Sequence, residues 1–83
     1  MQLAKFVKFR EEKFGGVLFE TRSEKVFTLT PTAAAVIREI VAGAADSEIA
    51  PRLAERFDAP AATIEREVSD FLAEMRAKGL VEG

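Results

Sequence analysis

Hydrophobic and polar positions alternate with a period of two in the first third of the chain. The stretches that carry this alternation are rich in Val, Phe and Thr, which predicts β-strands. A polar loop, residues 21–24, joins the second and third of these predicted strands as a hairpin. Val17 with Phe19, and Phe27 with Leu29, are expected to form the buried face, because side chains two positions apart lie on one side of a strand. The three predicted strands span residues 6–9, 16–20 and 25–29.

From residue 30 onward the hydrophobic period becomes that of a helix. Thr30, followed by proline, is typical of a helix start, and Gly43 and Gly79 predict the ends of the first and third helices. Ser47 is expected to cap the second helix, with Pro51 in its first turn. The predicted core stripes are Ala33, Val36, Ile37, Ile40 and Val41, then Ile49, Leu53 and Phe57, then Ile64, Val68, Phe71, Leu72 and Met75.

The order of three strands followed by three helices predicts an α+β fold. Residues 1–83 are enough for one domain with one core, with strands at about 5–29 and helices at about 31–79. Packing the helices on one face of a three-stranded antiparallel sheet would bury the apolar side of each element. Helices two and three, joined by a break at residues 58–60, form a pair like that of a winged helix-turn-helix protein. Leu80-Val81 is expected to form a last packed turn or a short strand.

The composition narrows the possible functions. Hydrophobic residues make up 48% of the chain and charged residues 31%, which is a globular balance. No apolar run approaches the ~18 residues of a membrane span, and the N-terminus has no signal-peptide core, so a cytoplasmic location and no membrane partner are expected. Without His or Cys, zinc, haem and iron–sulfur sites lose their usual ligands, and no metal or cofactor is expected.

Catalysis is also not expected. The chain contains serines and threonines but no histidine that could activate them as nucleophiles. Acidic pairs such as Asp70 and Glu74 are neighbours on one helix face and are typical of an exposed charged surface. The sequence therefore predicts a binding protein that is not an enzyme.

A winged-helix DNA-binding transcription factor is the alternative function. Base edges are read mainly by Arg, Lys, Asn and Gln, yet the chain has no Asn and only Gln2. The predicted recognition helix carries four acidic and three basic side chains between residues 61 and 78. Because phosphate neutralisation dominates DNA affinity, nucleic acid is not expected as the partner.

The third predicted strand offers a different kind of site. Residues 25–29 form an edge of the sheet and contain no proline, so an extended peptide could pair with them. The residues alone leave open whether this edge binds a peptide or is simply solvated.

An ordered set of motifs narrows this choice. From Phe14 to Val81 the chain resembles the PqqD-like family of RiPP recognition elements, small domains that bind the leader segment of a ribosomally made precursor peptide. Thr30 departs from the family, in which asparagine is frequent there, but either residue can cap a helix. The 58–63 connection is longer than usual. The matching motifs are Gly16, Leu29-Thr30-Pro31-Thr32, Gly43, Glu48-Ile49, Phe71-Leu72 and Gly79-Leu80-Val81.

The resemblance implies a partner and a site. In the family the leader adds as a strand beside strand three, contacts helix three and is presented to a maturation enzyme. That enzyme is expected to be a radical S-adenosylmethionine enzyme or another maturase. Met1 suggests a stand-alone protein, with a domain excised from such an enzyme as the other possibility. The pocket is expected to be apolar, floored by Val26 or Thr28, with charged side chains at its rim. The implied peptide-binding residues are Lys25, Val26, Phe27, Thr28, Leu29, Arg66, Val68, Asp70, Phe71, Glu74 and Met75.

Overall fold

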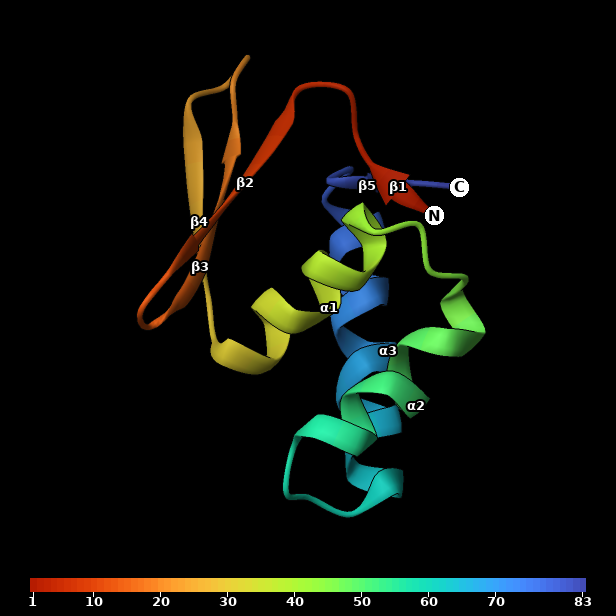
Figure 1. The fold of residues 1–83 in the computed structure, drawn as a ribbon. Helices are drawn as coiled ribbons and strands as arrows, with labels where there is room; N and C mark the ends of the chain where they lie inside the picture. The colour runs from red at the N-terminus through yellow and green to blue at the C-terminus, as the bar shows by residue number, and fades with distance from the viewer.

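A three-stranded antiparallel meander precedes three helices, as the sequence predicts, and a short ribbon joins the two ends of the chain (Figure 1). The structure is a computed structural model that describes all residues from 1 to 83. The strands of the meander pair in the order β2-β3-β4, so β2 and β4 are its edges. The elements are β1 (Gln2–Leu3), β2 (Val7–Glu12), β3 (Gly15–Glu20), β4 (Lys25–Leu29), α1 (Pro31–Val41), α2 (Asp46–Arg56), α3 (Ala61–Ala77) and β5 (Val81–Glu82).

The register of the sheet corrects the expected buried face of β3. Leu18 pairs with Phe27 and is fully buried, whereas Val17 and Phe19 are only half-buried. Val17 and Phe19 therefore lie on the opposite side of the sheet from Phe27, and the prediction that they face the core was wrong. The predicted alternation of β3 is one position out of phase, and a one-residue shift moves every side chain of a strand to the other face.

Helix α1 is the one that lies against the sheet. Thr30 caps it, with its hydroxyl oxygen accepting a hydrogen bond from the Ala33 amide at 3.2 Å. Gly43, with φ of 90°, follows its end as expected. α1 packs on β3 and β4, while α2 and α3 pack on α1 and on each other, so the expectation that all three helices cover the sheet holds for α1 alone.

Helix α2 begins two residues earlier than a Ser47 cap would allow. Its N-cap is Ala45, whose amide donates to the Glu48 carboxylate at 2.7 Å, so Ser47 lies inside the first turn. Pro51 is consequently the sixth helical residue and not a first-turn residue. The Glu48 carboxylate satisfies a free amide at the helix start, which is the task the sequence analysis gave to a serine hydroxyl.

The core lies between the sheet and the helices and is formed by the predicted stripes with few exceptions. Val41 is exposed, and Ala33, Phe57 and Phe71 are half-buried at the edge of the core. Side chains from every helix, from all three strands of the meander and from β5 meet in this cluster. Phe71 is thus only partly a core residue, which frees its ring for another role.

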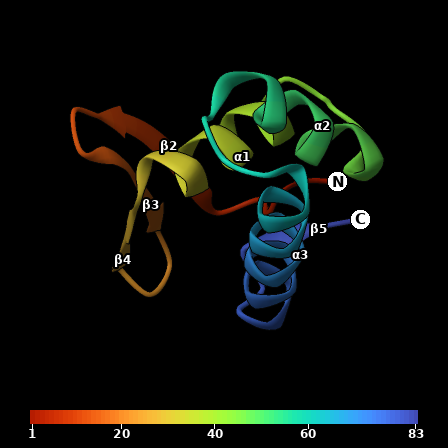
Figure 2. The ribbon, with the colours of Figure 1, turned by 90° about the horizontal axis from the view of Figure 1, so that it is seen from below.

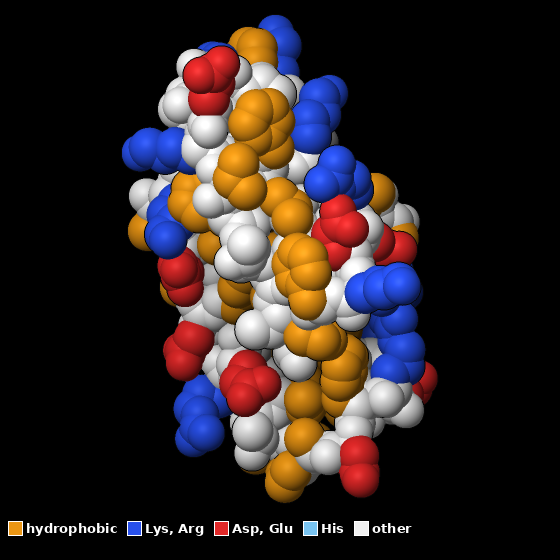
Figure 3. Space-filling model, turned by 90° about the vertical axis from the view of Figure 1, so that its left-hand side faces the viewer, with side chains coloured by type: hydrophobic (Ala, Val, Ile, Leu, Met, Phe, Trp, Pro, Cys, Tyr) orange, Lys and Arg blue, Asp and Glu red, His pale blue; other side chains and the backbone are white.

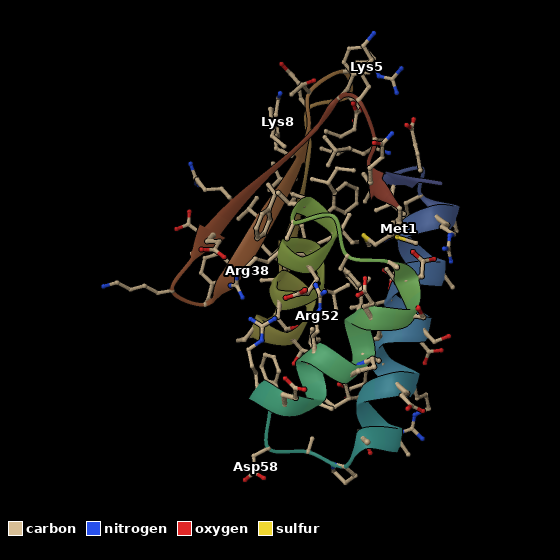
Figure 4. The ribbon with its side chains drawn as sticks, turned by 45° about the vertical axis from the view of Figure 1, so that its right-hand side comes forward. Met1, Lys5, Lys8, Arg38, Arg52 and Asp58 are labelled. Atoms are coloured by element: carbon tan, nitrogen blue, oxygen red, sulfur yellow. The ribbon has the colours of Figure 1, made fainter.

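Charged side chains join α1 to α2 outside this core. The Glu39 carboxylate accepts a hydrogen bond from Arg52 at 2.9 Å and forms a second ion pair with Arg56. The hydrogen bond from Arg52 holds the pKa of Glu39 below its usual range. Arg52 lies between the two helices, and Arg38 reaches from α1 toward Glu11 of β2 (Figure 4).

The two ends of the chain lie side by side. β1 pairs antiparallel with β5, with Leu3 opposite Val81, so one of the two forms expected for Leu80-Val81, a short strand, is present. β1 has no counterpart in the sequence analysis. None of the three helices has the length and hydrophobicity that a membrane span requires.

Candidate functional site

In Figure 2 the edge strand β4 and helix α3 lie apart, on either side of α1. A groove of about 470 Å³ lies between β4 and α3. Six of its ten lining residues are hydrophobic. The groove exists because α1 lies between the sheet and α3 and holds the two walls apart. Its lining residues are Val26, Phe27, Thr28, Leu29, Thr30, Ala33, Phe71, Glu74, Met75 and Lys78.

The two faces of β4 contribute differently. Phe27 and Leu29 share the helix-facing side with Leu18, and Leu29 is buried at the bottom of this side. Val26 and Thr28 pair with Phe19 and Val17 on the other face. The side chains on the strand side of the groove are therefore Phe27 and Leu29, and not Val26 or Thr28 as the sequence analysis expected.

Val26 and Thr28 contribute backbone instead. The Thr21 amide donates to the Phe6 carbonyl at 2.9 Å, which orients Thr21 toward β2. The backbone N–H and C=O groups of successive residues in an antiparallel strand point to opposite sides. Leu18, three residues before Thr21, therefore directs its backbone groups toward β4, where it pairs with Phe27. The N–H and C=O groups of Val26 and Thr28 consequently point to the open edge.

Helix α3 provides the other wall. Phe71 and Met75 present apolar surface, and Glu74 and Lys78 form an ion pair with Nζ 3.1 Å from Oε1. The Lys78 ammonium also lies 5.2 Å from the centre of the Phe27 ring, so it reaches across the groove to β4. A positive charge over an aromatic face is attracted by the ring, and this contact limits the groove at one end.

The groove continues past Phe71 into a second hollow of about 350 Å³. Both hollows share Thr30, Ala33 and Phe71, and the second adds Glu67, one helical turn before Phe71. Together they form a trough along α3, with Lys78 at one end and Glu67 at the other. The trough has an apolar middle and a charged residue at each end.

Most of the residues expected in the site are brought together here. The exceptions are Lys25, which is exposed at the start of β4, and Val68, which is buried in the core. Arg66 and Asp70 are exposed on α3 outside the groove. The predicted residues that do line the groove are Val26, Phe27, Thr28, Leu29, Phe71, Glu74 and Met75.

Helical spacing explains why Asp70 lies outside the groove and how Lys78, a groove residue that was not predicted, could have been found. Phe71, Glu74 and Lys78 recur at positions i, i+3 and i+7, which places them on one face of α3. Asp70 is one position earlier, about 100° around the helix, and points away. Lys78 could have been found by extending this spacing from Phe71, whereas Ala33 carries no signal that separates a groove residue from a core residue.

Most of the polar side chains of the groove already have partners. The hydroxyl of Thr30 is already used as a helix cap, and Glu74 is paired with Lys78. No three side chains of the metal-binding types His, Cys, Asp and Glu come together in the structure. What remains is an unpaired strand edge above an apolar trough, which is the geometry that accepts an extended polypeptide.

Comparison with known proteins places the chain in a family. No curated protein matches its sequence. A structure of TbiB1 in complex with the TbiA(beta) leader peptide has a TM-score of 0.88 at 23% identity, covering 100% of this chain and 96% of that one. Lasso peptide synthetase B1, complexed with the leader peptide, has a TM-score of 0.84 at 20% identity, covering 99% and 96%. These two likenesses show a shared fold. The model of the family named for coenzyme PQQ synthesis protein D matches residues 15–81, and the chain belongs to this PqqD family.

Proposed function

We propose that this protein binds the leader segment of a ribosomally made precursor peptide as an added strand beside β4. The observation that carries the proposal is the open edge at Val26 and Thr28 directly above an apolar trough. Membership of the PqqD family supports it, and so do two proteins of the same fold that were solved with leader peptides. The leader then contributes strand hydrogen bonds to β4 and side chains to the trough.

Free-energy magnitudes explain why the trough must be apolar. Ordering about six leader residues costs about 1–2 kcal/mol each, and about six strand hydrogen bonds return only about 0.5–1.5 kcal/mol each. Pairing alone therefore gives little affinity. Two or three buried apolar side chains, at about 1.5–3 kcal/mol each, bring the total toward the roughly −8 kcal/mol of micromolar binding.

The spacing of the trough favours alternate leader residues. Side chains two positions apart on a strand lie about 7 Å apart on one face. Two such side chains would enter the two hollows on either side of Phe71. The leader motif recognised by this protein is therefore apolar-x-apolar, with the intervening residue turned away from α3.

The protein acts in this proposal as an adaptor without catalysis of its own. Its groove contains no activated nucleophile. Its partner in this proposal is a maturation enzyme, either a radical S-adenosylmethionine enzyme or another maturase. We expect a precursor peptide and its maturase to be encoded beside this chain, so the neighbouring genes would identify both partners.

Calorimetric titration tests the proposal. The probe is a synthetic peptide of the N-terminal segment of the neighbouring precursor, and a scrambled peptide of the same composition is the control. We expect micromolar binding of the first and none of the second. A folded protein that binds neither peptide contradicts leader recognition.

A further inference from the structure

The side of the sheet that faces away from α1 is an exposed apolar surface, which we call the outer face. It consists of two cross-strand rows, Arg10–Val17–Thr28 and Lys8–Phe19–Val26. Five of these residues line a shallow hollow of about 550 Å³, in which β2 supplies the basic side chains and β3 and β4 supply the apolar ones. Thr28 closes the end of its row.

No helix or loop covers this surface. Val26 is 58% exposed, and Val17 and Phe19 are half-buried only by their neighbours in the sheet. Figure 3 shows hydrophobic side chains in a column down this side of the molecule, with Lys and Arg side chains on both sides of its upper part. A sheet face with aromatic and β-branched side chains in contact with water marks an interaction site.

The unpaired charge on the outer face is positive. Lys8 makes no ion pair and lies on the side of the sheet away from α1 (Figure 4). Arg10 is paired at 2.7 Å with Glu12, which lies two residues further along β2 on the same face and beyond the hollow. Just before β2, the Phe6 ring lies against two further cations, Lys5 and Arg22, with the Arg22 guanidinium 4.4 Å from its centre. The hollow itself contains no carboxylate.

We infer that the outer face docks the maturation enzyme, through an enzyme surface with an apolar centre and carboxylates along one side. The inference rests on the proposed function, because β4 forms both the outer face and the wall of the groove. A leader strand paired with β4 would present every second side chain beside Val26 and Thr28, on the outer face. The enzyme would then contact a composite surface made by adaptor and leader together.

The usual size of protein–protein interfaces explains why the composite surface of adaptor and leader is needed. A standard interface takes about 20–30 residues and about 800 Å² from each partner, far more than the six residues of the two rows. The empty adaptor therefore binds the enzyme weakly, and an added strand widens the sheet and strengthens docking. This difference would direct the enzyme to adaptors that carry a leader.

A second copy of this chain fits the outer face less well. An isologous dimer places the same patch of both copies in one interface. The two copies of Lys8 would then bring two unpaired cations to a hollow without carboxylates, while each Arg10 is already paired with Glu12. An acidic surface on a different protein removes this repulsion and adds electrostatic steering to the association.

The test uses variants that spare the groove. Phe19→Thr removes the central aromatic ring while keeping a strand-forming residue, and Lys8→Glu reverses the exposed charge; neither residue lines the groove. Phe14→Thr and Lys13→Glu make the same changes at exposed residues in the β2–β3 turn and serve as controls. Biolayer interferometry measures binding of the full chain to the purified maturation enzyme encoded beside its gene, with and without the leader, and calorimetry measures leader binding.

We expect the leader to raise the enzyme affinity of the wild type, and Phe19→Thr and Lys8→Glu to lower it by about 10-fold or more while leader affinity stays within about twofold. The turn controls should match the wild type. Unchanged enzyme affinity in both outer-face variants would overturn the docking assignment, and equal affinity of empty and loaded adaptor would overturn the composite surface. A wild-type dimer that Phe19→Thr dissociates, seen by analytical ultracentrifugation, would assign the face to self-association instead. Failure of the proposed function is a separate result, since it appears as absent leader binding in the calorimeter.

Discussion

Glu20 at the end of β3 organises the turn that leads into the edge strand. Its carboxylate accepts backbone hydrogen bonds from Arg22 at 3.0 Å and Ser23 at 2.9 Å. Hydrogen bonds from the Ser23 side chain and the Arg22 amide lower the pKa of Glu20 to about 2. Because the folded pKa is lower than the unfolded one, the ionised carboxylate stabilises the fold above the ordinary value of 4.5, and this stabilisation is lost as the pH falls toward 2.

We therefore expect Glu20→Gln to be less stable than the wild type at pH 7 and to approach it in stability as the pH falls from 4.5 to 2. Urea denaturation midpoints at several pH values measure this convergence. Glu24→Gln removes a carboxylate from the same turn without removing these hydrogen bonds. A constant difference between Glu20→Gln and the wild type at every pH would contradict the role of the ionised carboxylate.

Phe71 is the residue on which the two hollows of the trough meet. It is half-buried, so Phe71→Ala is expected to leave the fold intact and to lower leader affinity by about 30-fold, as truncation of an aromatic anchor does. Titration calorimetry gives the affinity, and circular dichroism confirms the fold. Phe14→Ala makes the same truncation at an exposed turn residue and should bind like the wild type. Equal binding by both variants would place the anchor elsewhere.

Helix α3 separates binding from stability along its length. Leu72 follows Phe71 directly but faces the core, where it is 6% exposed. Leu72→Ala is expected to destabilise the protein by roughly 2–5 kcal/mol, because the cavity cannot be refilled. Chemical denaturation measures the loss, and leader affinity of the fraction that remains folded should change little. An unchanged midpoint would show that Leu72 is exposed and contributes nothing to the core.

The edge strand allows the sharpest test of strand addition. Thr28 directs its amide outward, so Thr28→Pro removes a hydrogen-bond donor that the sheet itself does not use. We expect loss of leader binding with the fold retained. Thr28→Val keeps the amide and changes only the hydroxyl, and it should bind as the wild type does. If the proline variant is folded and binds normally, the leader does not pair with this edge.

Sequence periodicity predicts elements better than it predicts faces. The strand at Lys25–Leu29 and the ends of α1 and α3 agree with the structure because turns, caps and glycines act locally. The phase of β3 was wrong because Val17, Leu18 and Phe19 are all apolar, and only pairing with β4 decides which of them is buried. β1 was not anticipated, because its pairing with β5 joins the two ends of the chain.

In the candidate site, too, locally determined features could be predicted and features set by tertiary packing could not. The open edge could be predicted, since it depends on the order of strands and the absence of proline. Arg66 and Asp70, which were expected at the rim, lie outside the groove, because packing against α1 and α2 sets the rotation of α3 about its axis. Lys78 reaches Phe27 across the groove, and that contact exists only once both walls are in position.

The whole molecule divides its charge between sheet and helices. Residues 1–29 carry six basic and four acidic side chains, and the remaining residues carry six basic and ten acidic ones. Lys5 and Lys8 lie at the sheet end, and Asp58 lies at the opposite end (Figure 4). The helix pair α2–α3 that would approach DNA in a winged-helix protein is therefore the more acidic part. This distribution disfavours duplex binding through α3 and is compatible with peptide binding at β4.

Thermal stability distinguishes these two functions in a single experiment. A ligand that binds only the folded state at 100 times its dissociation constant stabilises it by about 2.7 kcal/mol. For a domain of this size each kcal/mol raises Tm by about 4–8 °C, so saturating leader should raise Tm by about 10–20 °C. We expect this shift in differential scanning calorimetry of the wild type, no shift for Thr28→Pro, and no shift with random-sequence duplex at physiological salt. A duplex-induced rise in Tm that disappears as salt increases would reverse the assignment in favour of nucleic acid, because salt screens phosphate contacts but acts only weakly on an apolar trough.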